Sequence, residues 1–222
     1  MFVHTHPYQP FLFKEATKLI VGTLPPPRFT TKELKDGDVD FCYGSKDGYL
    51  WPILERIFAI GLTFENSKDE VAKRKAFLKE RGIGICDIVE SAERYKIDAS
   101  DLGMHNIELR DVVAQLNLFP KVHTLLFTGG NSKNGPEYFF RRQLKQYRIK
   151  LELVNNIVPR IHSFELKGES GIKRTIKTVS LTAPSGAANR AIGSLDDYKG
   201  MKQEDVNFNT IDYRVLQYRP FF

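Results

Sequence analysis

The feature that most constrains the fold is a short apolar run that ends in a glycine and three prolines. Lys18–Val21 favours a β-strand, Gly22 follows it, and residues 25–27 are all proline. Because proline lacks a backbone N–H and has a fixed φ, this run cannot continue as the interior of a helix or sheet. The stretch therefore predicts a buried strand over 18–23 that ends in a rigid loop. In an open α/β sheet, such a loop lies where ligands bind.

Length and composition limit the kind of protein this can be. A chain of 222 residues suits a single α/β domain, which we expect to span 1–222. No apolar run approaches about 18 residues, and the N-terminus lacks the features of a signal peptide. Cys42 and Cys86 are the only cysteines, and neither has a partner at metal-ligand spacing. We therefore expect a cytoplasmic, intracellular protein with no disulfide framework, no metal site and no cofactor.

The net charge of +6 is compatible with a polyanionic partner, because phosphate contacts dominate affinity for nucleic acids. Many equally basic domains have no such partner, so charge alone leaves both interpretations open. His4 and His6 stand one residue apart, but no nearby residue completes a metal site.

Strand and helix patterns alternate after the first strand. The expected strands are 18–23, 82–89, 122–127 and 149–154, and the expected helices are 49–58, 67–82, 107–118 and the segment from 136. Asp47, Ser67 and Asn134 are candidate N-caps for three of these helices. Residues 90–106 have the polar composition of a connection.

Residues 163–182 depart from this alternation. Segments 163–166 and 172–181 flank Lys-Gly-Glu-Ser-Gly, a pattern typical of a β-hairpin. We therefore expect an α/β fold of three layers, α/β/α, with a short central parallel sheet and a hairpin inserted near the C-terminus. The tail, 205–222, would close over the core.

Three loops would then gather at the carboxyl edge of the sheet, namely 22–47, 128–134 and 182–190. The first has neither the glycines nor the early helix that a nucleotide-binding loop requires. The last lacks the Gly-x-Ser-x-Gly of a serine hydrolase. Ser185 at its centre is a good N-cap, and the small residues that follow it favour either close approach of a phosphate backbone or an ordinary helix start.

Taken together, the motifs resemble the uracil-DNA glycosylase superfamily, most closely its mismatch-specific and hypoxanthine-DNA glycosylase branches. Gly22-Thr-Leu-Pro25 stands where the first motif of that family belongs, and Ala183–Arg190 resembles the second. Between them, Tyr43–Leu54, Gly84–Val89 and Phe127–Asn131 follow the order of the family, so the resemblance covers residues 18–192.

The resemblance implies an enzyme that flips a damaged or mismatched base, such as uracil or hypoxanthine, out of double-stranded DNA and hydrolyses its N-glycosidic bond. The protein would act as a monomer without a cofactor. The pocket would be formed by Gly22, Leu24, Pro25, Tyr43, Ser45 and Asn131. The DNA backbone would be held by Pro184, Ser185, Gly186, Ala187, Asn189 and Arg190, with Ala187 near the position that wedges into the duplex.

Tyr43 would stack on the flipped base, although packing against Trp51 explains it equally well. Ser45 stands where the family has a histidine.

The catalytic position departs from the family. Leu24 and Gly48 stand where the two branches carry the asparagine that orients water. A carboxylate can orient water and stabilise a cationic sugar, so Asp47 becomes the first catalytic candidate, with Thr23 beside it and Asp87 a distant second. The alternative role for Asp47 is the helix cap. The alternative function is a non-catalytic protein of the same fold that binds nucleic acid or a small ligand.

Overall fold

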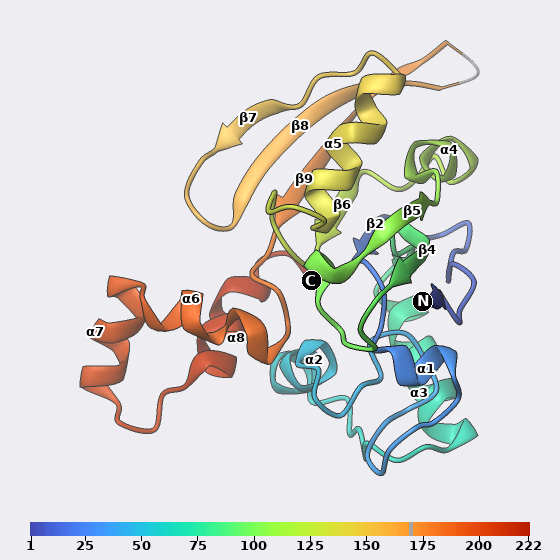
Figure 1. The fold of residues 1–222 in the computed structure, drawn as a ribbon. Coiled ribbons are helices and arrows are strands. Elements are labelled where there is room, and N and C mark those ends of the chain that lie inside the picture. The colour runs from blue at the N-terminus through green and yellow to red at the C-terminus, as the bar shows by residue number, and fades with distance from the viewer. Residues whose placement is uncertain (169–170) are drawn as a thin grey trace.

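A six-stranded mixed sheet forms the centre of the molecule in the computed structural model, which describes residues 1–168 and 171–222 (Figure 1). Its strand order is β3-β2-β6-β9-β8-β7. The first four strands in that order are parallel, and β8 and β7 are antiparallel to their neighbours. Their bounds are β2 Lys18–Val21, β3 Ile83–Ile85, β6 Thr124–Phe127, β7 Glu152–Asn155, β8 Arg160–Lys167 and β9 Lys173–Ser180.

The strand β2 lies between β3 and β6 and is buried on both faces. Leu19 and Val21 pack into one hydrophobic cluster, whereas Ile20 packs into a second cluster on the opposite face. This alternation follows from the period of two along a strand. The expectation of a buried first strand is confirmed, although the strand ends at Val21 rather than at residue 23.

Helices cover both faces of the sheet. On one face lie α4 (Val112–Leu118) and α5 (Pro136–Gln146); on the other lie α2 (Leu50–Phe58), α3 (Lys68–Glu80) and α8 (Thr210–Tyr218). Val215 and Tyr218 of α8 are buried in the second cluster, so the C-terminal tail covers the core as expected. The α/β fold with helices on both faces of a central sheet is thus confirmed.

The hairpin is not an insertion, which corrects the expectation. Strands β8 and β9 pair from Arg160↔Ser180 to Lys167↔Lys173, and β9 also pairs in parallel with β6. The hairpin therefore continues the central sheet, which is mixed rather than purely parallel. The expected strand 149–154 is also displaced, because β7 is an antiparallel edge strand at 152–155. The centre of the expected turn, Glu169-Ser170, lies outside the described residues.

A second sheet was not expected at all. It contains β1 (Phe2–Thr5), β4 (Val89–Arg94) and β5 (His105–Leu109), paired antiparallel in the order β1-β4-β5. The predicted strand 82–89, the polar connection 90–106 and the helix 107–118 are therefore wrong in part. Strand β4 was missed because its polar residues conceal a one-sided pattern in which Val89, Ala92 and Arg94 are buried.

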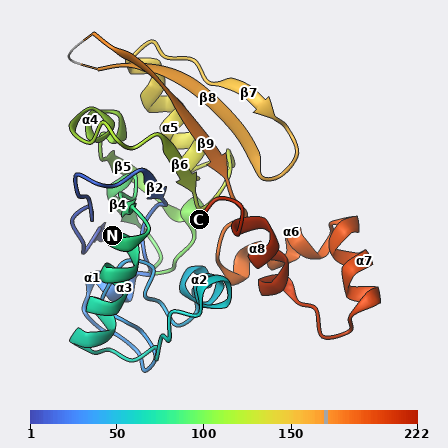
Figure 2. The ribbon, with the colours of Figure 1, turned by 180° about the vertical axis from the view of Figure 1, so that it is seen from behind.

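Short helices occupy the connections. Pro27 opens α1 (Pro27–Thr30), which corrects the expectation of an unbroken loop over 22–47, since proline is favoured at a first helical position. The remaining short elements are η1 Asp101–Gly103, η2 Gly186–Ala188, α6 Asn189–Gly193 and α7 Asp196–Glu204. Helices α6 and α7 project to one side of the sheet (Figure 2). Within the described part of the chain, no helix is long and apolar enough to span a membrane.

Only one of the three expected N-caps forms as predicted. The hydroxyl of Ser67 accepts a 3.1 Å hydrogen bond from the amide of Glu70. Helix α2 is preceded by Tyr49 with no side-chain cap, so Asp47 does not cap it. Gly135 precedes α5, and the side-chain amide of Asn134 instead donates to the backbone carbonyl of Asp101 at 2.9 Å.

Candidate functional site

The first and last of the three expected loops meet at the carboxyl edge of the parallel strands. Gly48, the residue that follows the first loop, forms an isolated antiparallel bridge with Ser185, and the amide of Tyr49 donates to the carbonyl of Pro184 at 2.8 Å. These contacts join segments that are more than 130 residues apart in the chain. The expected gathering of strand-end loops is therefore confirmed for this pair.

Asp87, two residues after the end of β3, is the centre of this edge. Its Oδ1 accepts hydrogen bonds from the amide of Gly22 at 2.7 Å and from the hydroxyl of Tyr43 at 2.6 Å. Its Oδ2 lies 3.0 Å from Nε2 of His6. The side chain is buried, and three donors satisfy its oxygens, so Asp87 is well placed to fix the loops relative to one another.

Tyr43 connects the loop after β6, residues 128–134, to the same centre. Its hydroxyl lies 3.3 Å from Oγ1 of Thr128, which follows β6. Burial, followed by the charge of Asp87 and the hydrogen bond to it, raises the pKa of Tyr43 well above its ordinary value, so the phenol stays protonated and donates. The residue is half-buried and packs against the cluster that contains Trp51, while stacking on a base stays a prediction.

Gly22 is required by close packing at this centre. A Cβ atom at this position would lie 2.3 Å from the Tyr43 hydroxyl and 2.8 Å from both Asp87 Oδ1 and Thr128 Oγ1. Any side chain here would separate the three polar groups. The glycine that ends the first apolar run is therefore explained by its neighbours rather than by a positive φ.

Thr23 donates a 2.8 Å hydrogen bond to Asp101 Oδ1, and Asp101 is a residue that the sequence did not single out. Burial raises the pKa of Asp101, while Thr23 and Arg94 oppose this shift. The backbone of Asp101 is anchored by Asn134 from the loop after β6. A buried carboxylate with a raised pKa is a candidate for a functional role. The only sequence signal was an acidic residue in a segment interpreted as a connection.

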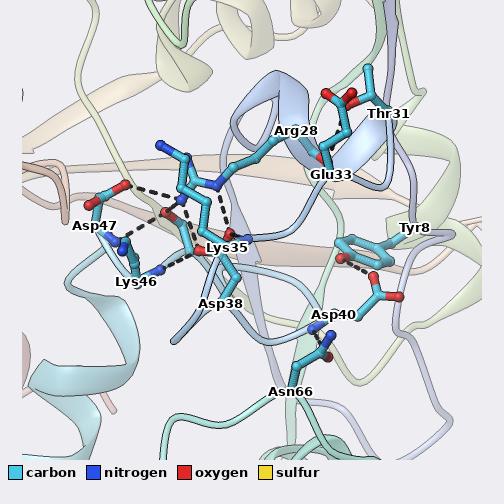
Figure 3. A network of polar contacts seen from close by, with 11 residues as sticks. Tyr8, Arg28, Thr31, Glu33, Lys35, Asp38, Asp40, Lys46, Asp47 and Asn66 are labelled. Carbon is cyan, nitrogen blue, oxygen red and sulfur yellow. Dashed lines mark hydrogen bonds and ion pairs between the residues drawn. The ribbon is translucent and has the colours of Figure 1, made fainter.

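Asp47 belongs to a neighbouring network centred on Arg28 (Figure 3). The guanidinium contacts Asp38 at 2.6 and 2.8 Å, Ser45 Oγ at 2.8 Å and Asp47 Oδ2 at 3.1 Å. The Asp47 side chain is 65% exposed. Asp47 and Ser45 thus share one arginine at the surface, and this pairing, not a helix cap, fixes the Asp47 carboxylate.

Asp38 is the buried anchor of that network. Its carboxylate also accepts from the amides of Lys35 and Lys46, both at 2.9 Å. Burial alone would raise its pKa, but the hydrogen bonds from Arg28 and the two amides outweigh burial and lower the pKa to about 2. The Asp38 side chain thus connects Arg28, Lys35 and Lys46 within the loop that carries Tyr43.

The last loop is organised by Arg214, which the sequence did not identify. Arg214 is buried and donates to the carbonyls of Ala183 at 3.0 Å and Ser185 at 2.9 Å, and to Oδ1 of Asn189 at 3.0 Å. Asn189 Oδ1 also accepts from Thr210, so its oxygen faces the protein interior. Ser185 precedes η2 without a side-chain cap bond, which corrects the expected N-cap.

The remaining predicted residues differ in exposure. Pro184 is buried, Leu24 and Pro25 are half-buried, and Gly186, Ala187, Arg190 and Asn131 are exposed. Asn131 lies beside Tyr138 and Arg141 in a groove on α5. Burial raises the pKa of both Cys42 and Cys86, which suits inert core thiols. No group of three metal-ligating side chains occurs within 1–168 and 171–222.

Comparison of this chain with protein-family models, with curated proteins and with solved structures finds no match.

Proposed function

We propose that this chain is a DNA glycosylase-like hydrolase with the arrangement of the uracil-DNA glycosylase superfamily. The supporting observation is the convergence of the segments that follow β2, β3 and β6 on one centre formed by Gly22, Tyr43, Asp87 and Thr128. The partner is double-stranded DNA that contains a damaged or mismatched base, such as uracil or hypoxanthine. Such a base is flipped most readily, because its pairing is weak.

The pocket in this proposal is rigid before substrate arrives. Gly22–Pro25 forms its floor, and the hydrogen bond to Asp87 fixes the ring of Tyr43 for stacking. Ser45, held by Arg28, donates or accepts a hydrogen bond at the base. Preorganised donors are valuable here because the leaving base carries negative charge in the transition state.

Hydrolysis adds water to the C1′ carbon of the deoxyribose, breaks the C1′–N bond, and leaves the electron pair and a proton on the departing base. Two carboxylates divide this work in the proposal. Asp101, together with Thr23, orients and deprotonates the water, because burial raises the pKa of its carboxylate and so favours proton uptake. Asp47, held by Arg28, stabilises the positive charge on the sugar.

The DNA backbone would run over the last loop, where Gly186, Ala187 and Arg190 are exposed. Pro184 and Ser185 shape this loop through their contacts with Tyr49 and Gly48.

The second candidate function is a non-catalytic nucleic-acid-binding or small-ligand-binding protein. It is favoured by Leu24, which cannot orient water at the position where mismatch-type relatives carry asparagine.

Duplexes that carry uracil, hypoxanthine or xanthine, incubated with the protein and then treated with alkali, test the enzyme. Strand cleavage at one lesion supports the proposal. DNA binding without cleavage at any lesion overturns it in favour of the non-catalytic alternative. Absent or salt-insensitive DNA affinity overturns both nucleic-acid interpretations and leaves the small-ligand site.

A further inference from the structure

A groove runs along the outer side of α5, between the helix and the segment that returns to β7. Its volume is about 500 Å³. The residues that line it are Asn131, Tyr138, Arg141, Arg142, Leu144, Lys145, Ile149, Lys150 and Leu151. Four of these are cationic, and none is acidic.

Three of the four cations are free to meet a ligand. Arg142, Lys145 and Lys150 are exposed, and none of them forms an ion pair with a residue in 1–168 or 171–222. The guanidinium of Arg142 lies 5.9 Å from the ring centre of Tyr138, which also lines the groove. Unpaired cations of this kind suit phosphate groups better than a neutral ligand.

The fourth cation, Arg141, is held in place by two neighbouring side chains. Arg141 contacts the buried carboxylate of Glu137 at 2.7 Å and Nε2 of His162 at 2.8 Å. Burial and the neighbouring arginine lower the pKa of His162, so the imidazole adds no charge of its own at neutral pH. Glu137 pairs with Arg141 and also with Arg160, at 3.7 Å, whereas the other three cations of the groove have no such partner among the described residues.

The clustering is specific to this groove and does not simply reflect the basic composition. A second hollow of similar size, about 420 Å³, lies on the sheet β1-β4-β5. Its charged lining residues are Glu90, Glu93 and Glu108. The two hollows therefore carry opposite charge, and a polyanion is attracted to the α5 groove.

The groove also shares a loop with the candidate site. Asn131, which lines the groove, lies in the loop after β6, and the same loop carries Thr128. Helix α5 has 11 residues, which at 1.5 Å per residue gives a length of about 16 Å. This length matches the rise of roughly four to five nucleotides along one strand of DNA.

We propose that the α5 groove is a second nucleic-acid contact, which binds the sugar–phosphate backbone of duplex DNA beside the strand-end site. The proposal rests on the proposed function for the class of partner, but it does not depend on base excision. Arg142, Lys145 and Lys150 each contact a phosphate, and the groove sets the register of the duplex without reading its sequence.

Binding of a fluorescent duplex of about 20 base pairs, measured over a series of salt concentrations, tests this surface. The triple variant Arg142→Gln/Lys145→Gln/Lys150→Gln is expected to bind about ten- to a hundredfold more weakly and to lower the salt slope by about 2 to 3. The control is Lys14→Gln/Lys68→Gln/Lys79→Gln, which removes the same charge from exposed positions before β2 and on α3.

Each outcome separates the two proposals. If the salt dependence of DNA affinity has the same slope in the wild type and the groove variant, the groove proposal is overturned. Equal losses of affinity in the groove and control variants also overturn it. If the groove variant loses affinity but retains the single-turnover excision rate at saturating protein, both proposals stand. Groove-dependent DNA binding without excision by the wild type supports the groove and overturns the enzyme. Groove-dependent binding to phosphatidylserine vesicles that exceeds binding to DNA overturns the nucleic-acid assignment.

Discussion

The phenolic hydroxyl of Tyr43 donates a 2.6 Å hydrogen bond to Oδ1 of Asp87. Tyr43 lies in the long loop after β2, and Asp87 lies two residues after the end of β3. This contact therefore connects the carboxyl ends of two neighbouring parallel strands. The amide of Gly22 donates to the same oxygen at 2.7 Å. A hydroxyl, an amide and a buried carboxylate thus form one unit on which the candidate pocket depends.

Replacing Gly22 by alanine is expected to disrupt this unit. The new Cβ would lie within 2.8 Å of three polar side-chain atoms, so the hydrogen bonds of Tyr43 and Asp87 must open. We expect the free energy of unfolding, measured by urea denaturation, to fall by about 2–4 kcal/mol. Gly200→Ala in α7 is the control, because nothing lies within 4 Å of its Cβ and alanine favours a helix by up to about 1 kcal/mol. Equal stability of the two variants would contradict the packing described for Gly22.

Asp38 is expected to make stability depend on pH in the acid range. Its folded-state pKa of about 2 lies below the ordinary 3.8, so the unfolded chain takes up the proton first as the pH falls. The stabilisation is therefore complete above about pH 4 and is lost between about pH 4 and 2. A shift of this size corresponds to about 2 kcal/mol.

Urea denaturation at a series of pH values should show this loss in the wild type and not in Asp38→Asn. Asp36→Asn, at an exposed position in the same loop, should retain the wild-type dependence. A steep wild-type slope that persists in Asp38→Asn would assign it to other carboxylates.

His4 is expected to affect stability over a higher pH range. It is fully buried and its Nδ1 accepts a 2.7 Å hydrogen bond from Arg94. Burial, followed by the charges of Arg94 and His6, lowers the pKa of His4 from 6.5 to about 4. Between these values the unfolded chain binds more protons, so stability falls as the pH falls from about 6.5 to 4, by up to about 3 kcal/mol.

The variant His4→Gln retains an acceptor for Arg94 and removes the titrating group, so its stability should vary less over this range. His105→Gln, on exposed β5, is the control and should follow the wild type. Part of the slope should remain in His4→Gln, because burial also lowers the pKa of His162. A slope identical to that of the wild type would exclude His4 as its source.

The fold was predictable where local pattern and tertiary contacts agree. The apolar runs at 18–21 and 124–127 form central strands that are buried on both faces. Burial on both faces requires a continuous apolar run, and such a run can be recognised in the sequence. Strand β4 was not predictable from local sequence. Its Arg94 is buried because it donates a hydrogen bond to His4, a residue 90 positions away. Strand β9 was expected only as one half of a hairpin. It forms that hairpin with β8, and it is also the fourth parallel strand of the central sheet, because it pairs with β6.

The candidate site shows the same limit. The position of the loops followed from strand order, and Gly22 was identified from its place after an apolar run. Their partners were not predictable, because Asp101 approaches Thr23 across 78 residues and Arg214 approaches Ser185 across 29. Asp47 was chosen because it lies one residue before the position of the family's asparagine, with a helix cap as the alternative, whereas its observed partner is Arg28, from the other end of the same loop.

The two proposed catalytic carboxylates can be distinguished by pH profile. Asp101→Asn is expected to lower the single-turnover excision rate by about 10²- to 10⁴-fold, the usual contribution of a general base. Because the pKa of Asp101 is raised, the wild-type rate should fall as the pH falls through that pKa, and Asp101→Asn should lose this acid limb. Asp47→Asn should also reduce the rate strongly, but it should keep the acid limb, since a group that stabilises the sugar cation need not exchange a proton.

Asp98→Asn is the matched control, because Asp98 is an exposed neighbour in the same segment and should retain both rate and profile. An unchanged rate in Asp101→Asn would remove Asp101 from the reaction. An unchanged rate in Asp47→Asn would leave that residue only its pairing with Arg28, at 3.1 Å, which supports the loop rather than the chemistry.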